Sequence, residues 1–184
     1  MSSSLPEKRL AALYELLDFH ARLKNADEGK VWARVVDKLA VALDAEAATY
    51  FSYLPAKRHL IPRYALGGFA SFVTACAIDA ATGVCGWVAR HRKPALVDDA
   101  HRDERFFKDV DGLTGFKTRS VLAVPLIERR EVTGVIELLN KRSGPFTAED
   151  LRFALAACRA TATVLRALRL EGAVTRRASR KKSR

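Results

Sequence analysis

Two strand-forming runs in the second half of the chain constrain its fold more than any other feature. Ser120–Ile127 and Glu131–Asn140 are dominated by Val, Leu and Ile, and only Glu128-Arg-Arg130 separates them. A connection this short joins antiparallel neighbours, because parallel strands need a much longer crossover. The sequence therefore predicts a hairpin that belongs to an antiparallel sheet.

A second predicted hairpin lies nearer the N-terminus. Ala47–Leu54 and His59–Leu66 carry the aromatic and β-branched residues that strands favour, and Pro55-Ala-Lys-Arg58 suits a turn. Between the two hairpins, from Gly67 to Phe116, the pattern is irregular, with one short helix and one short strand, Pro94–Val97. Long irregular stretches in compact domains are usually functional, so this middle segment is the place to look for a site.

Three segments have the apolar periodicity of helices that pack on such a sheet. They are residues 6–24, the segment after Asp27, and a helix that begins after Thr147, forms a capping box with Asp150 and is predicted to end at Gly172. Their apolar stripes are Leu10, Leu13, Tyr14 and Leu17; Val31, Val35, Leu39 and Leu43; and Leu151, Leu155, Cys158, Ala162, Leu165 and Leu168. The element order predicts an α+β domain with one sheet and helices packed against it.

The positive charge of the chain is concentrated at its C-terminus. Lys and Arg number 32 against 21 Asp and Glu, a formal charge of +11, and residues 172–184 contain six basic side chains and no acidic one. This composition is typical of a solvated, disordered end, which we expect here. Contact with nucleic-acid phosphates is an alternative, although no aromatic residue stands among these charges to stack on bases.

The sequence lacks several motifs, and this narrows where the protein is expected to be located and which chemistry it is expected to perform. The N-terminus lacks the apolar core of a signal peptide, and the longest uncharged run, Tyr64–Ile78, is too short to span a bilayer. The three cysteines form no Cys-x-x-Cys pair, and the four histidines stand at no metal-ligand spacing. We expect a cytoplasmic protein without a membrane span, a disulfide framework or a metal site.

Six short runs follow one another from Gly83 to Asp150. They are Gly83-Val-Cys-Gly-Trp-Val-Ala-Arg90, Pro94-Ala-Leu-Val-Asp-Asp99, Asp103-Glu-Arg-Phe106, Thr114-Gly-Phe-Lys-Thr-Arg-Ser-Val-Leu-Ala-Val-Pro-Leu126, Val132-Thr-Gly-Val-Ile-Glu-Leu-Leu-Asn-Lys141 and Pro145-Phe-Thr-Ala-Glu-Asp150. Their order and spacing resemble the GAF family, sensor domains related in fold to PAS domains. The resemblance covers about residues 28–171. It implies a six-stranded antiparallel sheet with a ligand pocket on one face, roofed by the irregular middle segment.

On this basis we expect three parts. Residues 1–26 hold a helix that contacts a second subunit, residues 27–171 form the GAF domain, and residues 172–184 are the basic, disordered tail. We expect a homodimer, because one small sheet does not need the apolar stripes of both terminal helices. The output is expected to lie in a separate, unidentified partner protein.

One GAF motif can be matched residue by residue. Asn140, Lys141, Phe146 and Asp150 match a motif of the cyclic-nucleotide-binding GAF domains of phosphodiesterases and related cyclases, whose final Glu is replaced here by Leu151. The resemblance makes a cyclic nucleotide one candidate effector, whereas haem and bilin are not expected. From the residues alone, Lys141 and Asp150 can pair and clamp a strand to a helix, and we favour this structural latch.

The predicted pocket takes its lining from the N-terminal hairpin, residues 47–66, and from the irregular middle segment. Aromatic side chains there can wall a planar ligand, although each alone could equally belong to the core. The candidate pocket residues are Tyr50, Phe69, Phe72, Cys76, Trp87, Asp98, Phe106, Phe107 and Arg119.

Cys76 and Cys85 raise a different function. They resemble two of the three cysteines of the GAF-type reductase of free methionine-(R)-sulfoxide, whose chemistry needs a thiolate nucleophile and a resolving thiol. The segment that would hold the third, reactive cysteine, Leu113–Arg119, contains none. We therefore expect a non-catalytic domain that binds a small-molecule effector and regulates a partner. The alternatives are a redox enzyme or thiol sensor, and a ligand-free interaction scaffold.

Overall fold

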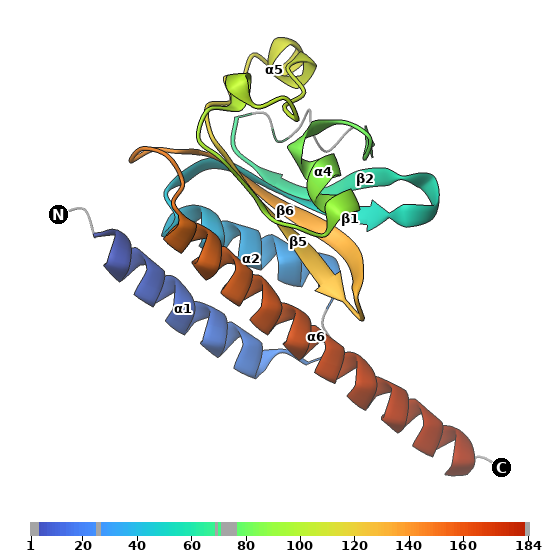
Figure 1. Ribbon diagram of the computed structural model, residues 1–184. Coiled ribbons are helices and arrows are strands. Elements are labelled where there is room, and N and C mark those ends of the chain that lie inside the picture. Colours follow the sequence, from blue (N-terminus) through green and yellow to red (C-terminus); the bar gives the residue numbers. More distant parts are fainter. Residues whose placement is uncertain (1–3, 25–26, 69, 71–76, 183–184) are drawn as a thin grey trace.

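A single antiparallel sheet organises the chain (Figure 1). The computed structural model describes residues 4–24, 27–68, 70 and 77–182. Six strands follow the order β3-β2-β1-β6-β5-β4, and every neighbouring pair is antiparallel. Their bounds are β1 (Ala45–Leu54), β2 (His59–Leu66), β3 (Ile78–Asp79), β4 (Ala95–Val97), β5 (Val121–Glu128) and β6 (Glu131–Lys141). The predicted α+β fold with a six-stranded antiparallel sheet is confirmed.

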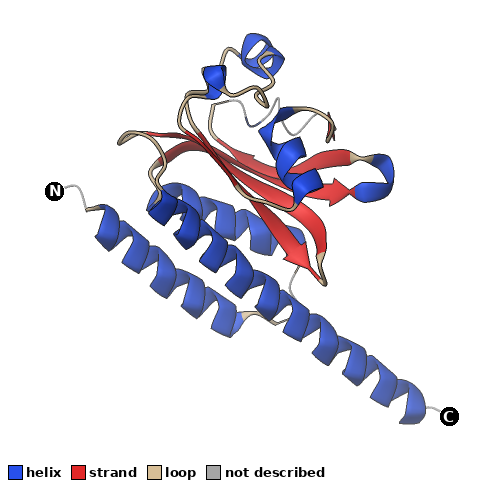
Figure 2. Cartoon of the chain, in the orientation of Figure 1, coloured by secondary structure: helices blue, strands red, loops and turns tan. Residues whose placement is uncertain are grey.

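The two faces of the sheet are covered differently (Figures 1 and 2). The long helices α1, α2 and α6 lie on one face, and the short helix α4 lies on the other, beside the connections that include α5. The helix bounds are α1 (Leu5–Arg22), α2 (Glu28–Ala42), α4 (Gly83–His91), α5 (Asp109–Thr114) and α6 (Ala148–Lys182), with 3₁₀ turns at Pro55–Lys57 and Ala100–Arg102. Among the described helices, none is both long and apolar enough to cross a membrane.

Both predicted hairpins are present. β1 pairs with β2, and β5 pairs with β6 from Val121 opposite Leu139 to Glu128 opposite Glu131. Arg129 and Arg130 occupy the tight turn with φ of 48° and 70°, a left-handed pair that Asn-Gly usually fills in two-residue hairpins. From Val135 to Leu139, strand alternation sends odd-numbered residues of β6 toward α4 and even-numbered residues toward the long helices.

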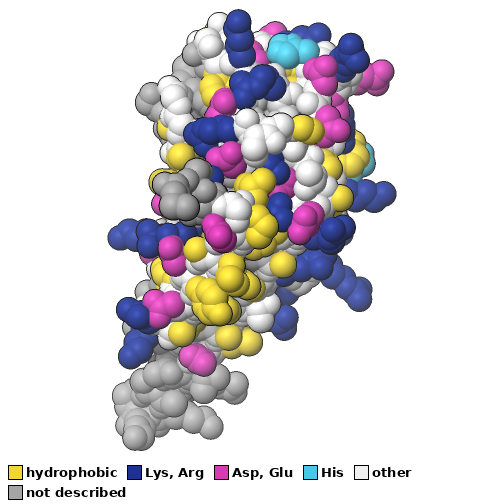
Figure 3. Space-filling view, turned by 90° about the vertical axis from the view of Figure 1, so that its left-hand side faces the viewer, with side chains coloured by type: hydrophobic (Ala, Val, Ile, Leu, Met, Phe, Trp, Pro, Cys, Tyr) yellow, Lys and Arg dark blue, Asp and Glu magenta, His cyan; other side chains and the backbone are white. Residues whose placement is uncertain are grey.

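The face covered by long helices is a closed apolar core. The stripe predicted for α2 is confirmed, because Val35, Leu39 and Leu43 are completely buried and Val31 nearly so. α1 is helical as predicted, but its predicted stripe faces outward: Leu10, Leu13, Tyr14 and Leu17 are all exposed. The side chains of α1 that are buried against its own chain are Ala12 and Leu16. Hydrophobic side chains gather in the middle of the view in Figure 3.

The last helix is longer than predicted. The predicted end at Gly172 is wrong, because α6 continues to Lys182 and runs past the rest of the molecule (Figure 1). A glycine inside a helix costs only about 1 kcal/mol relative to alanine, which a long helix of good helix formers can absorb. The backbone of residues 173–182, expected to be disordered, is therefore helical here. The division into residues 1–26, 27–171 and 172–184 stays a prediction.

The latch predicted from Asn140, Lys141, Phe146 and Asp150 is formed and buried. Lys141 Nζ lies 2.6 Å from Asp150 Oδ2, and the Thr147 amide donates to the same oxygen at 2.7 Å. Asn140 donates to the Lys117 carbonyl and accepts from the Arg119 amide, while Phe146 is buried at 2% exposure. Burial opposes the charge of Asp150, but the hydrogen bond from Lys141 holds the pKa of its carboxyl below the ordinary value. The pair is therefore part of the core and not of the surface.

Candidate functional site

A cavity of about 90 Å³ lies between the sheet and α4. Its floor is formed by side chains of β1, β3 and β6, one wall by the first turn of α4, and the roof by the connection that carries α5. The lining residues are Phe51, Ile78, Thr82, Gly83, Val84, Cys85, Phe106, Phe107, Asp111, Phe116, Thr118, Glu137 and Leu139. The lining is mostly apolar, with a few polar groups, as is typical of small-molecule sites.

Two glycines seat α4 over the cavity. Gly83 starts the helix with φ of 72°, a left-handed conformation that other residues rarely adopt. A Cβ on Gly86 would collide with the Ala80 carbonyl, so only glycine lets the helix approach the chain there. These positions bring Val84 and Cys85 against the sheet, where both are buried.

Glu137 stands on the cavity side of β6, near the middle of the sheet. Its neighbours across the strands are Thr49 on β1 and Ala123 on β5. Burial raises the pKa of its carboxyl, and a hydrogen bond with the Cys85 thiol partly offsets this rise. A carboxyl in this position destabilises the fold whenever it is charged, because desolvation disfavours the ionised form.

Asp111 is the second acid of the lining, and its contacts are structural. It accepts hydrogen bonds from the Thr118 amide at 2.7 Å and from the Thr118 hydroxyl at 2.6 Å, which ties α5 to the segment before β5. His101 Nε2 lies 3.6 Å from the same carboxylate. The imidazole of His101 in turn meets the edge of Phe106, with ring centroids 5.4 Å apart. Asp111 thus holds the roof in place.

The two described cysteines lie on opposite faces of the sheet. Cys85 lines the cavity, and burial, followed by the nearby Glu137 charge, raises the pKa of its thiol well above the ordinary value. Cys158, on α6, faces the core between the sheet and the long helices, where burial raises its thiol pKa to about 12. Reactive cysteines are thiolates with lowered pKa values, so neither site has the environment of a nucleophile.

The predicted pocket residues separate into several places. Phe106 and Phe107 line the cavity. Trp87 faces a neighbouring surface groove, under the guanidinium of Arg105 at 4.6 Å and stacked on His91. Tyr50 lies on the opposite face of the sheet, packed near Trp32.

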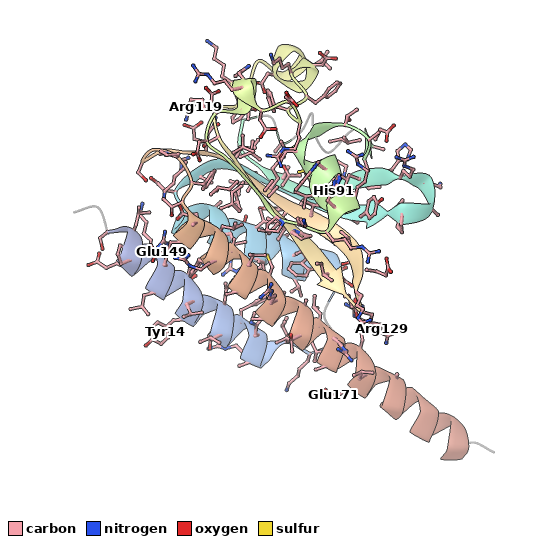
Figure 4. The ribbon with its side chains drawn as sticks, in the orientation of Figure 1. Tyr14, His91, Arg119, Arg129, Glu149 and Glu171 are labelled. Carbon is pink, nitrogen blue, oxygen red and sulfur yellow. The ribbon has the colours of Figure 1, made fainter. Side chains whose placement is uncertain are left out.

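The remaining predicted residues do not form the lining either. Asp98 is exposed in the connection after β4. Arg119 lies at the edge of the molecule (Figure 4), where its guanidinium pairs with Glu46 at 2.7 Å. Phe69, Phe72 and Cys76 lie outside the described residues.

The prediction missed Phe51, Glu137, Cys85 as a wall residue, and the Asp111–Thr118 brace. Glu137 left a signal in the sequence, since it is an acid between Ile136 and Leu138 within a buried strand. No comparable signal identifies Phe51 as a lining residue. Its neighbour Tyr50 is also aromatic, and strand alternation alone does not predict which face of the sheet holds the cavity.

The described lining contains no basic side chain. Glu137 and Asp111 are its ionisable acids, and neither Lys, Arg nor His faces the cavity among the described lining residues. The segment from Gly67 to Ala77 contains no charged residue in its sequence. Within the described residues, moreover, no three His, Cys, Asp or Glu side chains come together as a metal site.

Comparison with known proteins agrees with this architecture. The family model of the GAF domain matches residues 12–165. This chain belongs to the GAF family. The GAF domain of a phosphoenolpyruvate-protein phosphotransferase from Coxiella burnetii superposes with a TM-score of 0.75 at 20% identity, over 93% of this chain and 99% of that one.

Two further similar proteins carry names that indicate different activities. A free methionine-R-sulfoxide reductase from Neisseria meningitidis, solved with its substrate, has a TM-score of 0.76 at 17% identity, over 93% of this GAF domain and 96% of that chain. A probable 3′,5′-cyclic phosphodiesterase of Caenorhabditis elegans is 39% identical over 72 residues, which is 39% of this chain and 10% of that protein. The matching stretch thus spans about a tenth of that phosphodiesterase. The structural likeness shows the fold alone.

Proposed function

We propose that this GAF domain is a non-catalytic sensor that binds a small molecule in the cavity between the sheet and α4. The observation that carries the proposal is the Glu137 carboxyl, a half-buried side chain at the cavity floor with the Cys85 thiol as its hydrogen-bonding neighbour. A desolvated acid that faces a cavity and weakens the fold when it is charged is typical of functional sites, where function can outweigh stability.

The cavity is large enough for a fragment of a few non-hydrogen atoms. An engineered apolar cavity of about 150 Å³ binds benzene, and this one is smaller, at about 90 Å³. A larger effector would have to displace the roof, which consists of a six-residue helix and the connection carrying Phe106 and Phe107. Short elements of this kind rearrange at little cost compared with the long helices.

A cyclic nucleotide is one candidate effector. The Asn140–Asp150 motif and the likeness to a probable cyclic phosphodiesterase support it. The acidic lining opposes it, because a phosphate would be buried beside two carboxyls without a basic partner among the described lining residues.

Binding can be tested with two substitutions that each introduce a phenylalanine. Val84→Phe fills the cavity from α4, whereas Leu113→Phe adds the same ring at an exposed position of α5. We expect native mass spectra and thermal-shift screens of a metabolite panel, cyclic AMP and cyclic GMP included, to show a ligand with wild type and L113F only. A ligand that V84F keeps, or no stabilising compound at all, would contradict the proposal.

The alternative redox function has less support. It needs a low-pKa thiol, and burial raises the pKa of both described thiols. Thiol-dependent consumption of free methionine sulfoxide by the purified protein, lost in Cys85→Ser, would overturn the non-catalytic proposal. No consumption is expected.

The route from the cavity to a partner protein is short. Glu137 and Leu139 line the cavity on β6, and Lys141 ends the same strand in the buried pair with Asp150 of α6. Asp150 also pairs with Arg9 of α1. A shift of β6 on effector binding would therefore act on both terminal helices, which we propose as the surfaces that present the signal to a second subunit and to an output partner.

A further inference from the structure

The charge of the cavity defines a chemical class of effector, an inference that rests on the function proposed above. Glu137 and Asp111 are the acids of the described lining, no basic side chain belongs to that lining, and the sequence of residues 67–77 contains no charged residue. Asp111 already accepts two hydrogen bonds from Thr118 and lies near His101. Glu137, whose hydrogen-bonding neighbour is the Cys85 thiol of α4, is the acid left to meet a ligand.

We propose that the effector carries a positively charged nitrogen, an ammonium or amidinium group, that pairs with Glu137. Such a group compensates the carboxylate where solvent does not, and charge-assisted hydrogen bonds are about twice as strong as neutral ones. An anion in the same place would meet a like charge, and a neutral molecule would leave the carboxyl without compensation. The apolar remainder of the ligand would pack against Phe51, Phe106 and Leu139.

Three probes of one shape test this class. Isobutylammonium, isobutanol and isobutyrate share a branched carbon frame and differ in charge, and their affinities can be measured by protein-observed NMR titration. We expect the ammonium to bind at least about tenfold more tightly than the alcohol, and the carboxylate to bind least. Glu137→Gln should remove the preference for the ammonium and leave the alcohol unchanged, whereas Glu131→Gln, on the exposed end of the same strand, should change neither.

The outcomes separate this inference from the proposed function. Saturable binding of all three probes with equal affinity, or tightest binding of the carboxylate, overturns the cationic class while the pocket stands. Saturable binding of none of them overturns both. The ranking on wild type needs no variant, so the test survives a failure of E137Q to fold.

Discussion

The two faces of the sheet differ in how completely they are filled. Beneath the sheet, α2 and α6 bury large aliphatic side chains, and Val35, Val36 and Leu39 have no exposed surface. Above it, a nine-residue helix and irregular connections leave a cavity with a carboxyl at its floor. Long amphipathic helices can match a sheet side chain by side chain, whereas short elements leave gaps between them. In this domain one face supplies the stability and the other can be shaped for a ligand.

The largest effect is expected from breaking the buried ion pair on the filled face. Asp150→Asn leaves Lys141 and Arg9 without their common carboxylate, which should cost about 3–5 kcal/mol of unfolding free energy. Urea denaturation monitored by circular dichroism measures the loss. Glu149→Gln, its exposed neighbour on α6, is the control and should stay within about 0.5 kcal/mol of wild type. Equal losses for both would mean that the pair does not hold the face together.

A matched pair of truncations compares the two faces directly. Leu39→Ala opens a void in the filled face and should cost about 3–5 kcal/mol, because the neighbours of Leu39 relax only partially. Leu139→Ala removes the same atoms from a side chain that already borders the cavity, so we expect a loss smaller by about 1–2 kcal/mol. Denaturation curves of both variants give the difference. A larger loss at Leu139 would reverse the assignment of the two faces.

The smallest effect concerns the pH dependence of Glu137. Burial raises its pKa in the folded protein, so at neutral pH the unfolded chain ionises more readily and the carboxyl weakens the fold. Glu137→Gln should therefore raise the melting temperature at pH 7.5, and this gain should vanish as the pH falls below the ordinary carboxyl pKa. Melting curves from pH 4 to 8 measure it. A gain that grows toward acid pH would show the opposite shift.

Local sequence signals predicted the filled face well. The four-residue recurrence from Val31 to Leu43 identified α2 and its buried side, and Thr147 with Asp150 forms the predicted reciprocal cap, with the Asp150 amide donating to the Thr147 hydroxyl. These features depend on residues close in sequence. The apolar stripe of α1 is the exception. Its periodicity predicts an apolar side of the helix, but periodicity alone does not tell whether that side packs against the same chain.

The hollow face could be predicted only in outline. Tyr50 and Phe51 are adjacent aromatics in β1, yet alternation sends one to each face, and only the docking of α4 decides which face holds the cavity. Gly86 allows that docking, because it lets α4 approach the Ala80 backbone closely, and no local sequence pattern predicts this contact. The site is assembled from β1, β6, α4 and the α5 connection, so its lining depends on tertiary packing that single-sequence reasoning does not reach.

Methyl NMR during a titration with isobutanol tests the central claim, that ligand binding belongs to the cavity side of the sheet. With labelled Val and Leu methyl groups, Val84 and Leu139 report on the cavity, and Val35 and Leu39 report on the filled core. The account predicts saturable shifts at Val84 and Leu139 and none at Val35 or Leu39. No saturable shift at the cavity residues, or equal shifts on both faces, would contradict it.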